Sequence, residues 1–324
     1  MHSIQQVQEL INKAIADTKY HSRPAELYQP ISYLMELGGK RMRPTLALLS
    51  AELFGGNIMK ALNAAIGIEL FHNFTLMHDD IMDKAPLRRG KPTVHEKWSA
   101  STAILSGDAM FVEAYKMMAK VDDSILREIL EIFNETASAV CQGQQSDMNF
   151  EKRYDVSIDE YLHMIKQKTA ALLAGSMQIG ALIGGAAKFQ SKLVYEFGEN
   201  IGLAFQLQDD ILDVYGDPLK FGKRIGGDIL ANKKTFLLIK AKELSKDNRK
   251  VELANWLDGT SHEPGEKIKA VISIYDSLEV RKMAEDQMEE FVRKALAALD
   301  QIAPENGTKT LLKSFAESLL IREN

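Results

Sequence analysis

Apolar residues recur every three or four positions along most of the chain, which is the spacing of helices that bury one or more faces. The clearest case runs from about Ile58 to Asp83, where apolar residues cover most of the helix circumference and predict a central buried helix. Four further helices are expected over residues 44–54, from 157 onward, 190–215 and 279–303. Pro44 occupies a first-turn position, and Ser157 with Glu160 forms a capping box.

We find no paired alternating strands and no alternation of strands with helices. The chain has 21 Gly and 8 Pro in 324 residues, fewer than average, which favours long elements and few turns. A length of this order suggests two domains at about 150 residues each. Because no linker divides the chain, we instead expect an all-α fold, a single large helical bundle formed by one domain over residues 1–324.

The composition is that of a globular protein, with 45% apolar and 26% charged residues. A net charge of −5 offers no basic excess, so binding to nucleic acid is not expected. The single cysteine, Cys141, excludes an internal disulfide and a cysteine-rich zinc site, and it fits a reducing, cytoplasmic location. We expect Cys141 to be a buried apolar side chain. The first residues show no signal-peptide pattern.

Residues 169–187 contain no charge and are long enough to span a bilayer. They also contain Gly180 and Gly184, four residues apart, a spacing that permits close helix packing. Four glycines, a serine and a glutamine make the segment only modestly hydrophobic. We therefore expect a buried helix and turn, and no transmembrane segment.

Two matching acidic motifs of the form D-D-x-x-D end two apolar helices. They comprise Asp79, Asp80 and Asp83, and Asp209, Asp210 and Asp213. Residues four apart share a helix face, so the outer carboxylates of each motif lie together and repel each other unless a cation binds. Such oxygen ligands suit Mg²⁺, which bridges carboxylates to phosphates. An exposed acidic helix end explains one such motif equally well, but the recurrence of the motif favours a metal site.

Four basic clusters accompany the acidic motifs. They are residues 38–44, residues 88–91, Lys168-Thr169 and residues 223–234. Arg and Lys are the side chains that bind phosphate, and the glycines at 38 and 39 allow backbone amides to approach an anion. Each cluster alone is typical of a solvated surface. Together with twin acidic motifs they indicate one diphosphate bridged by metal and a second bound without metal.

These residues identify a resemblance to the trans-isoprenyl diphosphate synthases of the polyprenyl synthetase family, of the short-chain farnesyl and geranylgeranyl diphosphate synthase type. The motifs that carry it occur in the family's order, from GGKRMRP at Gly38 to ANKKT ending at Thr235, and include HDDIMD, LRRGKPT, FQLQDD and GGD. The resemblance implies an all-α isoprenoid synthase fold around a deep central cavity, and a homodimer. It implies condensation of isopentenyl diphosphate with an allylic diphosphate (dimethylallyl, geranyl or farnesyl) to an all-trans C15–C20 product.

The resemblance also implies residue roles. All six aspartates are expected to bind Mg²⁺ or lie beside it, with three ions bound and Mn²⁺ as the alternative metal. The allylic diphosphate is expected to contact Arg88, Lys168, Lys223 and Lys233. The isopentenyl diphosphate is expected to contact Lys40, Arg43, His72 and Arg89. Thr169 and Gln206 are expected to line the path of the developing cation, so that the catalytic residues are Lys168, Thr169, Gln206 and Lys223.

These roles agree with the chemistry. Ionisation of the allylic C–O bond requires neutralisation of the leaving diphosphate, which Mg²⁺, Lys and Arg provide. A closing loop at residues 216–235 would exclude water from the cation. Since no side chain is an evident base, the resemblance assigns the final proton to the released diphosphate.

Product length is expected to depend on the helix before Asp79. Phe74 lies about 7.5 Å and Phe71 about 12 Å before it along the helix axis, with Thr75 next to Phe74. In this family a bulky side chain there limits the growing lipid, so Phe71 and Phe74 predict a short product. The compact HDDIMD motif favours C20 over C15.

Three alternatives remain. Glu69-x-x-His72 and Glu160-x-x-His163 match the ligand spacing of a di-iron carboxylate bundle, although that assignment leaves both acidic motifs without a role. A class I terpene cyclase shares the first acidic motif, but its second motif differs and it needs no second diphosphate site. A non-catalytic partner subunit of a prenyltransferase normally lacks motif residues that are all present here.

Overall fold

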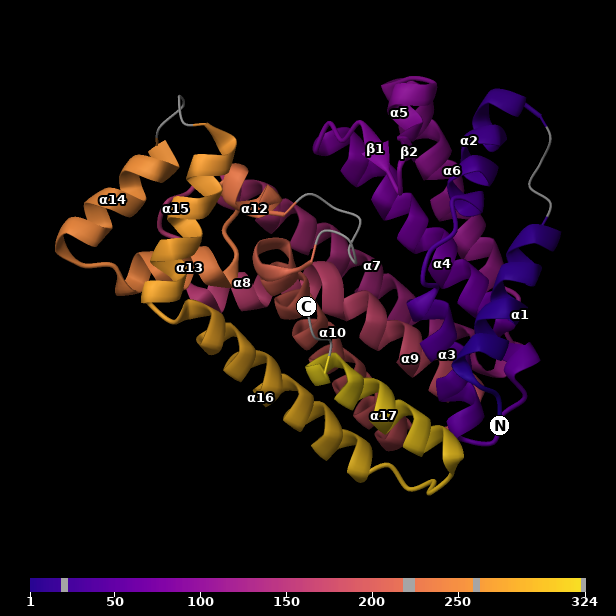
Figure 1. The fold of residues 1–324 in the computed structure, drawn as a ribbon. Helices are drawn as coiled ribbons and strands as arrows, with labels where there is room; N and C mark the ends of the chain where they lie inside the picture. Colours follow the sequence, from indigo (N-terminus) through magenta and orange to yellow (C-terminus); the bar gives the residue numbers. More distant parts are fainter. Residues whose placement is uncertain (19–22, 218–224, 259–262, 322–324) are drawn as a thin grey trace. The chain divides into compact units, whose positions relative to one another are not determined.

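The computed structural model describes residues 1–18, 23–217, 225–258 and 263–321. Helices form nearly all of its regular structure (Figure 1), so the predicted all-α fold is confirmed. In chain order the elements are α1 (Ile4–Asp17), α2 (Ala25–Glu36), α3 (Met42–Leu53), α4 (Ile58–Met82), β1 (Leu87–Arg88), β2 (Lys91–Pro92), α5 (Val94–Lys97), α6 (Ala100–Met118), α7 (Asp123–Glu151), α8 (Ile158–Ile165), the π-helical turn η1 (Lys166–Ala170), α9 (Ala171–Ile183), α10 (Lys188–Tyr215), α12 (Gly227–Leu230), α13 (Phe236–Leu244), α14 (Asp247–Asp258), α15 (Pro264–Ser277), α16 (Val280–Asp300) and α17 (Gly307–Ile321).

The chain divides into two compact units, each built from three separate segments. Unit 1 comprises Met1–Thr136, Leu172–Tyr195 and Ile302–Lys309. Unit 2 comprises Ala137–Ala171, Glu196–Gln301 and Thr310–Asn324. Because the segments interleave along the sequence, no single linker could have revealed this division. The single domain expected over residues 1–324 stays a prediction.

In unit 1 the predicted buried helix is α4, which packs against α3 and α6. The side chain of Asn57 caps its first turn by accepting a hydrogen bond from the amide of Met59. A Cβ at Gly67 of α4 would lie 3.0 Å from the carbonyl oxygen of Ala114 on α6. Glycine therefore lets these two helices approach closely, and α4 ends at the first acidic motif.

The uncharged segment is the buried helix and turn that the sequence predicts. It forms the end of η1, α9 and the turn that follows, and α9 is buried around its circumference. A Cβ at Gly180 would overlap the backbone of Ala47 on α3, and one at Gly184 would overlap Ala51. The small residues thus serve close packing within unit 1. Within the described ranges no helix combines the length and apolar character needed to cross a membrane.

In unit 2, α13 packs against α8, α15 and α16, while α12 and α14 pack against α15. The predicted capping box opens α8, where Ser157 and Glu160 each bond the other's backbone amide. The helix predicted over 279–303 is α16, and ion pairs at i, i+4 such as Arg281 with Glu285 lie on its surface.

One prediction in this region is wrong. Cys141 is exposed on α7, not buried. It lies on the same helical stripe as the exposed Ser138, Gln142 and Gln145, so its position follows the polar periodicity of α7 and not the apolar character of its own side chain.

Candidate active site

The first acidic motif ends α4 in unit 1. The Asp80 side chain is only 3% exposed, and both its oxygens accept hydrogen bonds of 2.8 Å from the Arg88 guanidinium. Asp79 is partly exposed and Asp83, the C-cap of the helix, is exposed. The bidentate bond fixes Asp80 and Arg88 together. The two outer carboxylates, Asp79 and Asp83, are thus the more accessible donors for a cation.

A short hairpin positions the arginines beside this motif. Its antiparallel strands are β1 and β2, and Arg89 and Gly90 at the turn have φ values of 53° and 74°. Positive values at both central residues are those of a type I′ turn. The sequence does not reveal this hairpin, because strands of two residues each are too short to show an alternating pattern. The turn places Arg88 on Asp80, and a Cβ at Gly39 would lie 2.7 Å from the guanidinium of Arg89.

A cluster of cations forms around the start of α3. Arg41 is buried and bonds the Glu69 carboxylate and the Met35 carbonyl, both at 2.6 Å. Arg43 bonds Nε2 of His72 at 3.2 Å, and no described carboxylate lies within ion-pair distance of Arg43. Its Nε is buried, with no hydrogen-bond acceptor among the described residues. Arg43 is thus a partly buried cation that has no carboxylate partner among the described residues.

Burial lowers the pKa of His72 well below its ordinary value, and the charges of Arg43 and Arg89 lower it further. His72 is therefore neutral, and its Nε2 accepts the hydrogen bond from Arg43. Burial also lowers the pKa of the Arg43 guanidinium, although Glu69 opposes this shift. Several arginines thus act on His72, and an anion bound beside them would be stabilised by their charge.

The second acidic motif lies on α10 in unit 2. Asp210 is 3% exposed and accepts hydrogen bonds from the Tyr161 hydroxyl at 2.5 Å and from Nε2 of Gln206 at 3.0 Å. Burial, more than any other cause, raises the pKa of Asp210 to about 7. Asp209 is exposed, and Asp213 accepts the backbone amide of Asp228 at 2.9 Å. As in the first motif, the middle aspartate is held by protein partners.

The π-helical turn η1 presents Lys168 and Thr169 in unit 2. Lys168 pairs with Asp147 at 2.5 Å, and the Thr169 hydroxyl donates to Oε1 of Gln206 at 3.0 Å. A Cβ at Gly143 of α7 would overlap the backbone of Lys168. π-Helical turns inside α-helices are frequent at functional sites, and this one depends on glycine for its close packing.

Lys233 lies among acidic side chains of unit 2. Burial opposes its charge, but Asp228, Asp210, Asp147 and Asp209 outweigh burial and raise its pKa. Its Nζ lies 3.7 Å from the Asp228 carboxylate. Lys233, Lys168 and the second motif therefore form one mixed-charge group. Lys223, expected to bind the same diphosphate, lies outside the described residues.

Across the described ranges, no three His, Cys, Asp or Glu side chains gather closely enough to hold a metal ion by themselves. Mg²⁺ normally retains several waters and uses one or two carboxylates with substrate phosphates. Each acidic motif, taken within its own unit, offers accessible carboxylates: Asp79 and Asp83 in unit 1, and Asp209 in unit 2. Carboxylate oxygens near Lys and Arg side chains fit Mg²⁺ that binds together with a diphosphate.

The expected chain-length residues belong to an aromatic cluster in unit 1. Phe71 is fully buried, and its ring centre lies 5.5 Å from Phe74 and Phe111 and 5.4 Å from Phe133. Phe74 stacks on Phe111 with an interplanar angle of 12°. The hydroxyl of Thr75 donates to the carbonyl of His72, so its polar atom is bonded within its own helix.

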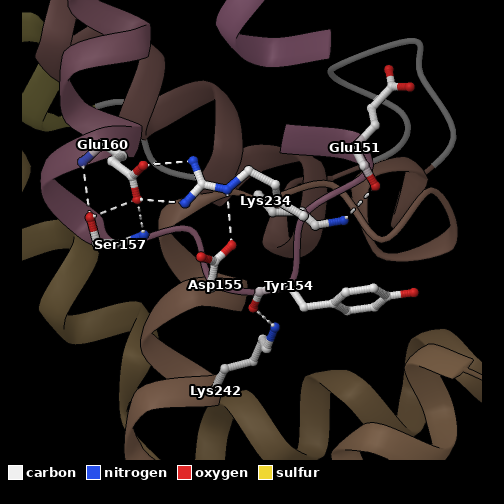
Figure 2. Close-up of polar contacts among 8 residues, drawn as sticks. Glu151, Tyr154, Asp155, Ser157, Glu160, Lys234 and Lys242 are labelled. Atoms are coloured by element: carbon white, nitrogen blue, oxygen red, sulfur yellow. Dashed lines mark hydrogen bonds and ion pairs between the residues drawn. The ribbon is translucent and has the colours of Figure 1, made fainter. Parts of the chain in front are cut away.

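Both Glu-x-x-His motifs have structural roles. Glu69 pairs with the buried Arg41, and Glu160 pairs with Arg153 at 2.7 Å while closing its capping box (Figure 2). His163 is exposed. Because the glutamates are already engaged and no metal-binding group of three forms among the described side chains, the structure gives no support to a di-iron site.

Four residues of these groups were missed by sequence reasoning, namely Arg41, Asp147, Tyr161 and Asp228. Arg41 and Asp228 lie inside motifs that the sequence analysis quoted, so a signal existed for them. Asp147 lies outside every motif, and Tyr161 is only a variable position of Glu160-x-x-His163. Their roles depend on the packing of α8 and α7 against α10 or η1, which local pattern does not reveal.

Comparisons with known proteins agree with this arrangement. The model of the polyprenyl synthetase family matches residues 24–275. The chain is 36% identical over 315 residues to a geranylgeranyl diphosphate synthase of Methanosarcina mazei, covering 97% of this chain and 95% of that protein. It is 33% identical to a geranylfarnesyl diphosphate synthase of Natronomonas pharaonis, covering 99% and 97%.

A crystal structure of a geranylgeranyl pyrophosphate synthase is similar over the full length of both chains, with a TM-score of 0.95 and 42% identity. The family model covers well over half of the chain, and the relatives cover nearly all of it. The chain therefore belongs to the polyprenyl synthetase family, and it is a prenyltransferase with an all-α fold.

Proposed function

We propose that the chain condenses isopentenyl diphosphate with an allylic diphosphate to give an all-trans C15–C20 prenyl diphosphate, with C20 favoured. The observation that carries this proposal is Arg43, a partly buried cation beside the neutral His72. Its Nε is buried without an acceptor, and it has no carboxylate partner among the described residues. An enzyme that joins two diphosphate substrates needs a second diphosphate site, and here that site would bind its diphosphate without metal. A terpene cyclase, which uses one diphosphate, has no need of such a site.

We assign the isopentenyl diphosphate to this cluster of unit 1, where Lys40, Arg43, His72 and Arg89 would contact it. Arg43 and Arg89 donate to its phosphate oxygens, and Gly39 leaves room for Arg89 to do so. Neutral His72 supports Arg43 through Nε2 and leaves its other ring nitrogen as a donor. The homoallylic double bond is thereby held in place without covalent attachment.

We assign the allylic diphosphate to Lys168 and Lys233, with Lys223 and Arg88. Mg²⁺ held by Asp79, Asp83 and Asp209 would supply further neutralisation of the leaving diphosphate, with three ions expected and Mn²⁺ as an alternative. Asp80, Asp210 and Asp213 complete the proposed set beside the metal. The structure supports holding roles for Asp80 and Asp210, because Arg88 and Tyr161 already bond them.

In the proposed reaction the allylic C–O bond breaks and the electron pair leaves with diphosphate. The isopentenyl double bond then attacks the allylic carbon, forming a C–C bond, and the released diphosphate takes the proton lost next to it. Thr169 and Gln206 are bonded to each other, and their oxygen dipoles would stabilise the developing positive charge.

The preference for C20 rests on two supports. The aromatic cluster of Phe71, Phe74 and Phe111 places bulk along α4 before the first acidic motif. The relative from Methanosarcina mazei and the similar crystal structure both carry geranylgeranyl names. We further propose a cytoplasmic homodimer. Its support is an exposed apolar stripe on α6, formed by Ile104, Leu105 and Val112.

The proposal is tested by incubating the full chain with labelled isopentenyl diphosphate, Mg²⁺ and each of dimethylallyl, geranyl and farnesyl diphosphate. We expect incorporation and an all-trans product of C20. Absence of incorporation with every primer would contradict the proposal and favour a non-catalytic partner subunit. Release of diphosphate from an allylic primer alone, with a hydrocarbon product, would favour a cyclase.

A further inference from the structure

A pocket in unit 2 contains no residue assigned above to substrate or metal. Its volume is about 590 Å³, within the usual range of small-molecule sites. Its walls are the end of α7, Tyr154, the segment 231–234, α13 and α14. We call it the Lys234 pocket, and the residues that line it are Glu151, Tyr154, Ala231, Asn232, Lys234, Leu238, Lys242, Ser245, Lys250, Leu253, Ala254, Leu257 and Asp258.

Three lysines line the pocket without an ion-pair partner among the described residues. The Nζ of Lys234 donates to the carbonyl oxygen of Glu151 at 3.3 Å, and that of Lys242 donates to the carbonyl oxygen of Tyr154 at 2.5 Å. Figure 2 shows both lysines directed toward this backbone, while the Glu151 carboxylate points away from Lys234. Since an ammonium group has three donors, each lysine retains donors for a ligand.

The two ammonium groups are close enough to repel each other. Burial lowers the pKa of Lys234 and the charge of Lys242 lowers it further, while the Glu151 carboxylate partly opposes these shifts. A bound anion would remove this repulsion. Lys250, the third cation, lies at the exposed start of α14.

Apolar side chains line part of the pocket, together with the acidic residues Glu151 and Asp258. Leu238 and Leu253 are 4% and 2% exposed, and the ring of Tyr154 is 78% exposed beside Lys242. An aromatic ring left so open next to paired cations is suited to cover an apolar group whose head is an anion. The lining therefore matches a molecule with an anionic head and an apolar part.

The rim around Tyr154 is held in place before any ligand binds. Arg153 bonds Asp155 at 2.9 Å and Glu160 at 2.7 Å, and Glu160 closes the capping box with Ser157 (Figure 2). This network ties the rim to the start of α8. A preformed rim lowers the entropy lost on binding.

One wall of the pocket is shared with the catalytic group. Lys233 lies among Asp228 and Asp210, whereas the adjacent Lys234 lines the pocket. Asn232, which precedes the two lysines, links this segment to α14. Its φ is 51°, and its Nδ2 donates to the carbonyl of Leu257 on α14 at 2.9 Å. A ligand that moves α14 would therefore move the backbone that carries Lys233.

We propose that the Lys234 pocket binds a small phosphate-bearing amphiphile, with its phosphate between Lys234 and Lys242 and its apolar part on Leu238 and Leu253, and that its occupancy changes the affinity for the allylic diphosphate. The second half of this proposal rests on the proposed function. By linkage, the allylic diphosphate must change the affinity of the pocket by the same factor.

Binding is tested on the full chain carrying Trp98→Phe, so that Trp256 of α14 is the remaining tryptophan. Octyl phosphate, inorganic phosphate and octanol are titrated in chelator without substrate, and Trp256 emission is followed. We expect saturable binding of octyl phosphate. The affinity for inorganic phosphate should be at least roughly tenfold lower. Equal affinity for octyl phosphate and inorganic phosphate would overturn the amphiphile assignment.

The paired variant Lys234→Ala/Lys242→Ala should weaken octyl phosphate binding by roughly tenfold or more, because it removes two charged donors. The matched control is Lys246→Ala/Lys269→Ala, two exposed lysines of unit 2 that do not line the pocket. Lys250→Glu is a second variant, at an exposed site, that tests the same prediction without touching buried structure. Unchanged affinity in Lys250→Glu and in a folded paired variant would overturn the site.

The coupling is tested by steady-state assays with and without octyl phosphate. We expect KM for the allylic primer to change at least about twofold in the parent and not in the paired variant. An unchanged KM despite demonstrated binding would overturn the coupling. A chain that binds octyl phosphate but shows no prenyl transfer would contradict the proposed function and leave the binding site standing.

Discussion

The middle and outer aspartates of each acidic motif have different environments. Asp80 and Asp210 are buried and held by Arg88 and Tyr161, while Asp79, Asp83 and Asp209 retain exposed surface. A buried carboxylate that is already bonded fixes the end of its helix more readily than it binds a hydrated ion. At the scale of single residues, a motif of identical side chains thus contains two chemical roles.

Arg43 carries the first prediction at this scale. Replacing it by Gln removes the cation that lacks a carboxylate partner in the described structure, so binding of isopentenyl diphosphate should weaken. We expect kcat/KM for isopentenyl diphosphate to fall roughly a hundredfold, with KM for the allylic primer nearly unchanged. Steady-state assays measure both, and Arg127→Gln on the exposed surface is the control. Equal losses for both substrates would contradict the assignment.

His72 gives a prediction about pH. Its pKa is depressed in the folded chain and ordinary, about 6.5, in the unfolded chain. The unfolded state therefore binds the extra proton below about pH 6.5, so this contribution to stability is present above that pH and is lost as pH falls, by up to about 1.4 kcal/mol per pH unit.

His72→Gln keeps an acceptor for Arg43 but does not titrate. Its free energy of unfolding, measured in urea from pH 7.5 to 5.0, should fall less steeply than that of the parent chain. His163→Gln, at an exposed position, should keep the parent slope. Identical slopes for His72→Gln and the parent would show that the pKa of His72 is not lowered in the folded chain.

At the scale of elements, short irregular segments place most of the chemistry. The π-helical turn η1 carries Lys168 and Thr169, and the hairpin of β1 and β2 carries Arg88 and Arg89. Both depend on glycine, at Gly143 for the close approach of η1 and at Gly90 for the turn. The long helices form the scaffold, and these short non-α-helical segments orient the Lys and Arg side chains.

Gly143→Ala tests this role of η1. The added Cβ would overlap the backbone of Lys168, so the turn must shift. We expect a loss of stability of about 1–3 kcal/mol and a fall in kcat of roughly tenfold or more. Gln145→Ala, on the exposed face of the same helix, is the control. Full activity in a folded Gly143→Ala chain would show that the position of η1 is not critical.

The aromatic cluster between α4, α6 and α7 gives a prediction on product length. Phe74 and Phe111 stack on each other and are both partly buried. Replacing either one by Ala removes one ring of the pair, so we expect products longer than C20 from either variant. Chromatography of the dephosphorylated products measures this. Phe71→Ala should also lengthen the product, but it should cost about 3–5 kcal/mol because Phe71 is fully buried. An unchanged product distribution in all three variants would remove the cluster from chain-length control.

At the scale of the whole molecule, metal and substrate are expected to bind as one unit. Since the described side chains form no metal-binding group of three, Mg²⁺ alone should barely change Tm. Mg²⁺ with inorganic diphosphate should raise Tm by several degrees, because binding to the folded state adds roughly 3 kcal/mol at 100 times Kd. A large shift with Mg²⁺ alone in a thermal unfolding assay would point to a site built from protein ligands. Chelation should abolish activity without unfolding the chain.

The sequence by itself determined the all-α fold class, several of the long helices, the acidic motifs and the family. Helical periodicity and i, i+4 spacing are local properties, so α4, α9 and α16 lie close to where the pattern placed them. The chemistry of the motifs is equally local, because D-D-x-x-D defines a helix face wherever the helix lies. The exposure of Cys141 differed from the prediction, because the polar face of α7 determines it.

The tertiary structure decided what each of these residues can do. Tyr161 donates a hydrogen bond to Asp210, and Arg41 bonds Glu69. Lys233 lies among aspartates whereas Lys234 lines a separate pocket, although the two are neighbours in sequence. These outcomes depend on residues far apart in the chain that packing brings together. Burial then changes the energies, by keeping His72 neutral and leaving Arg43 charged without a carboxylate partner in the described structure. A pattern of residue types contains neither the distances nor the burial that set these energies.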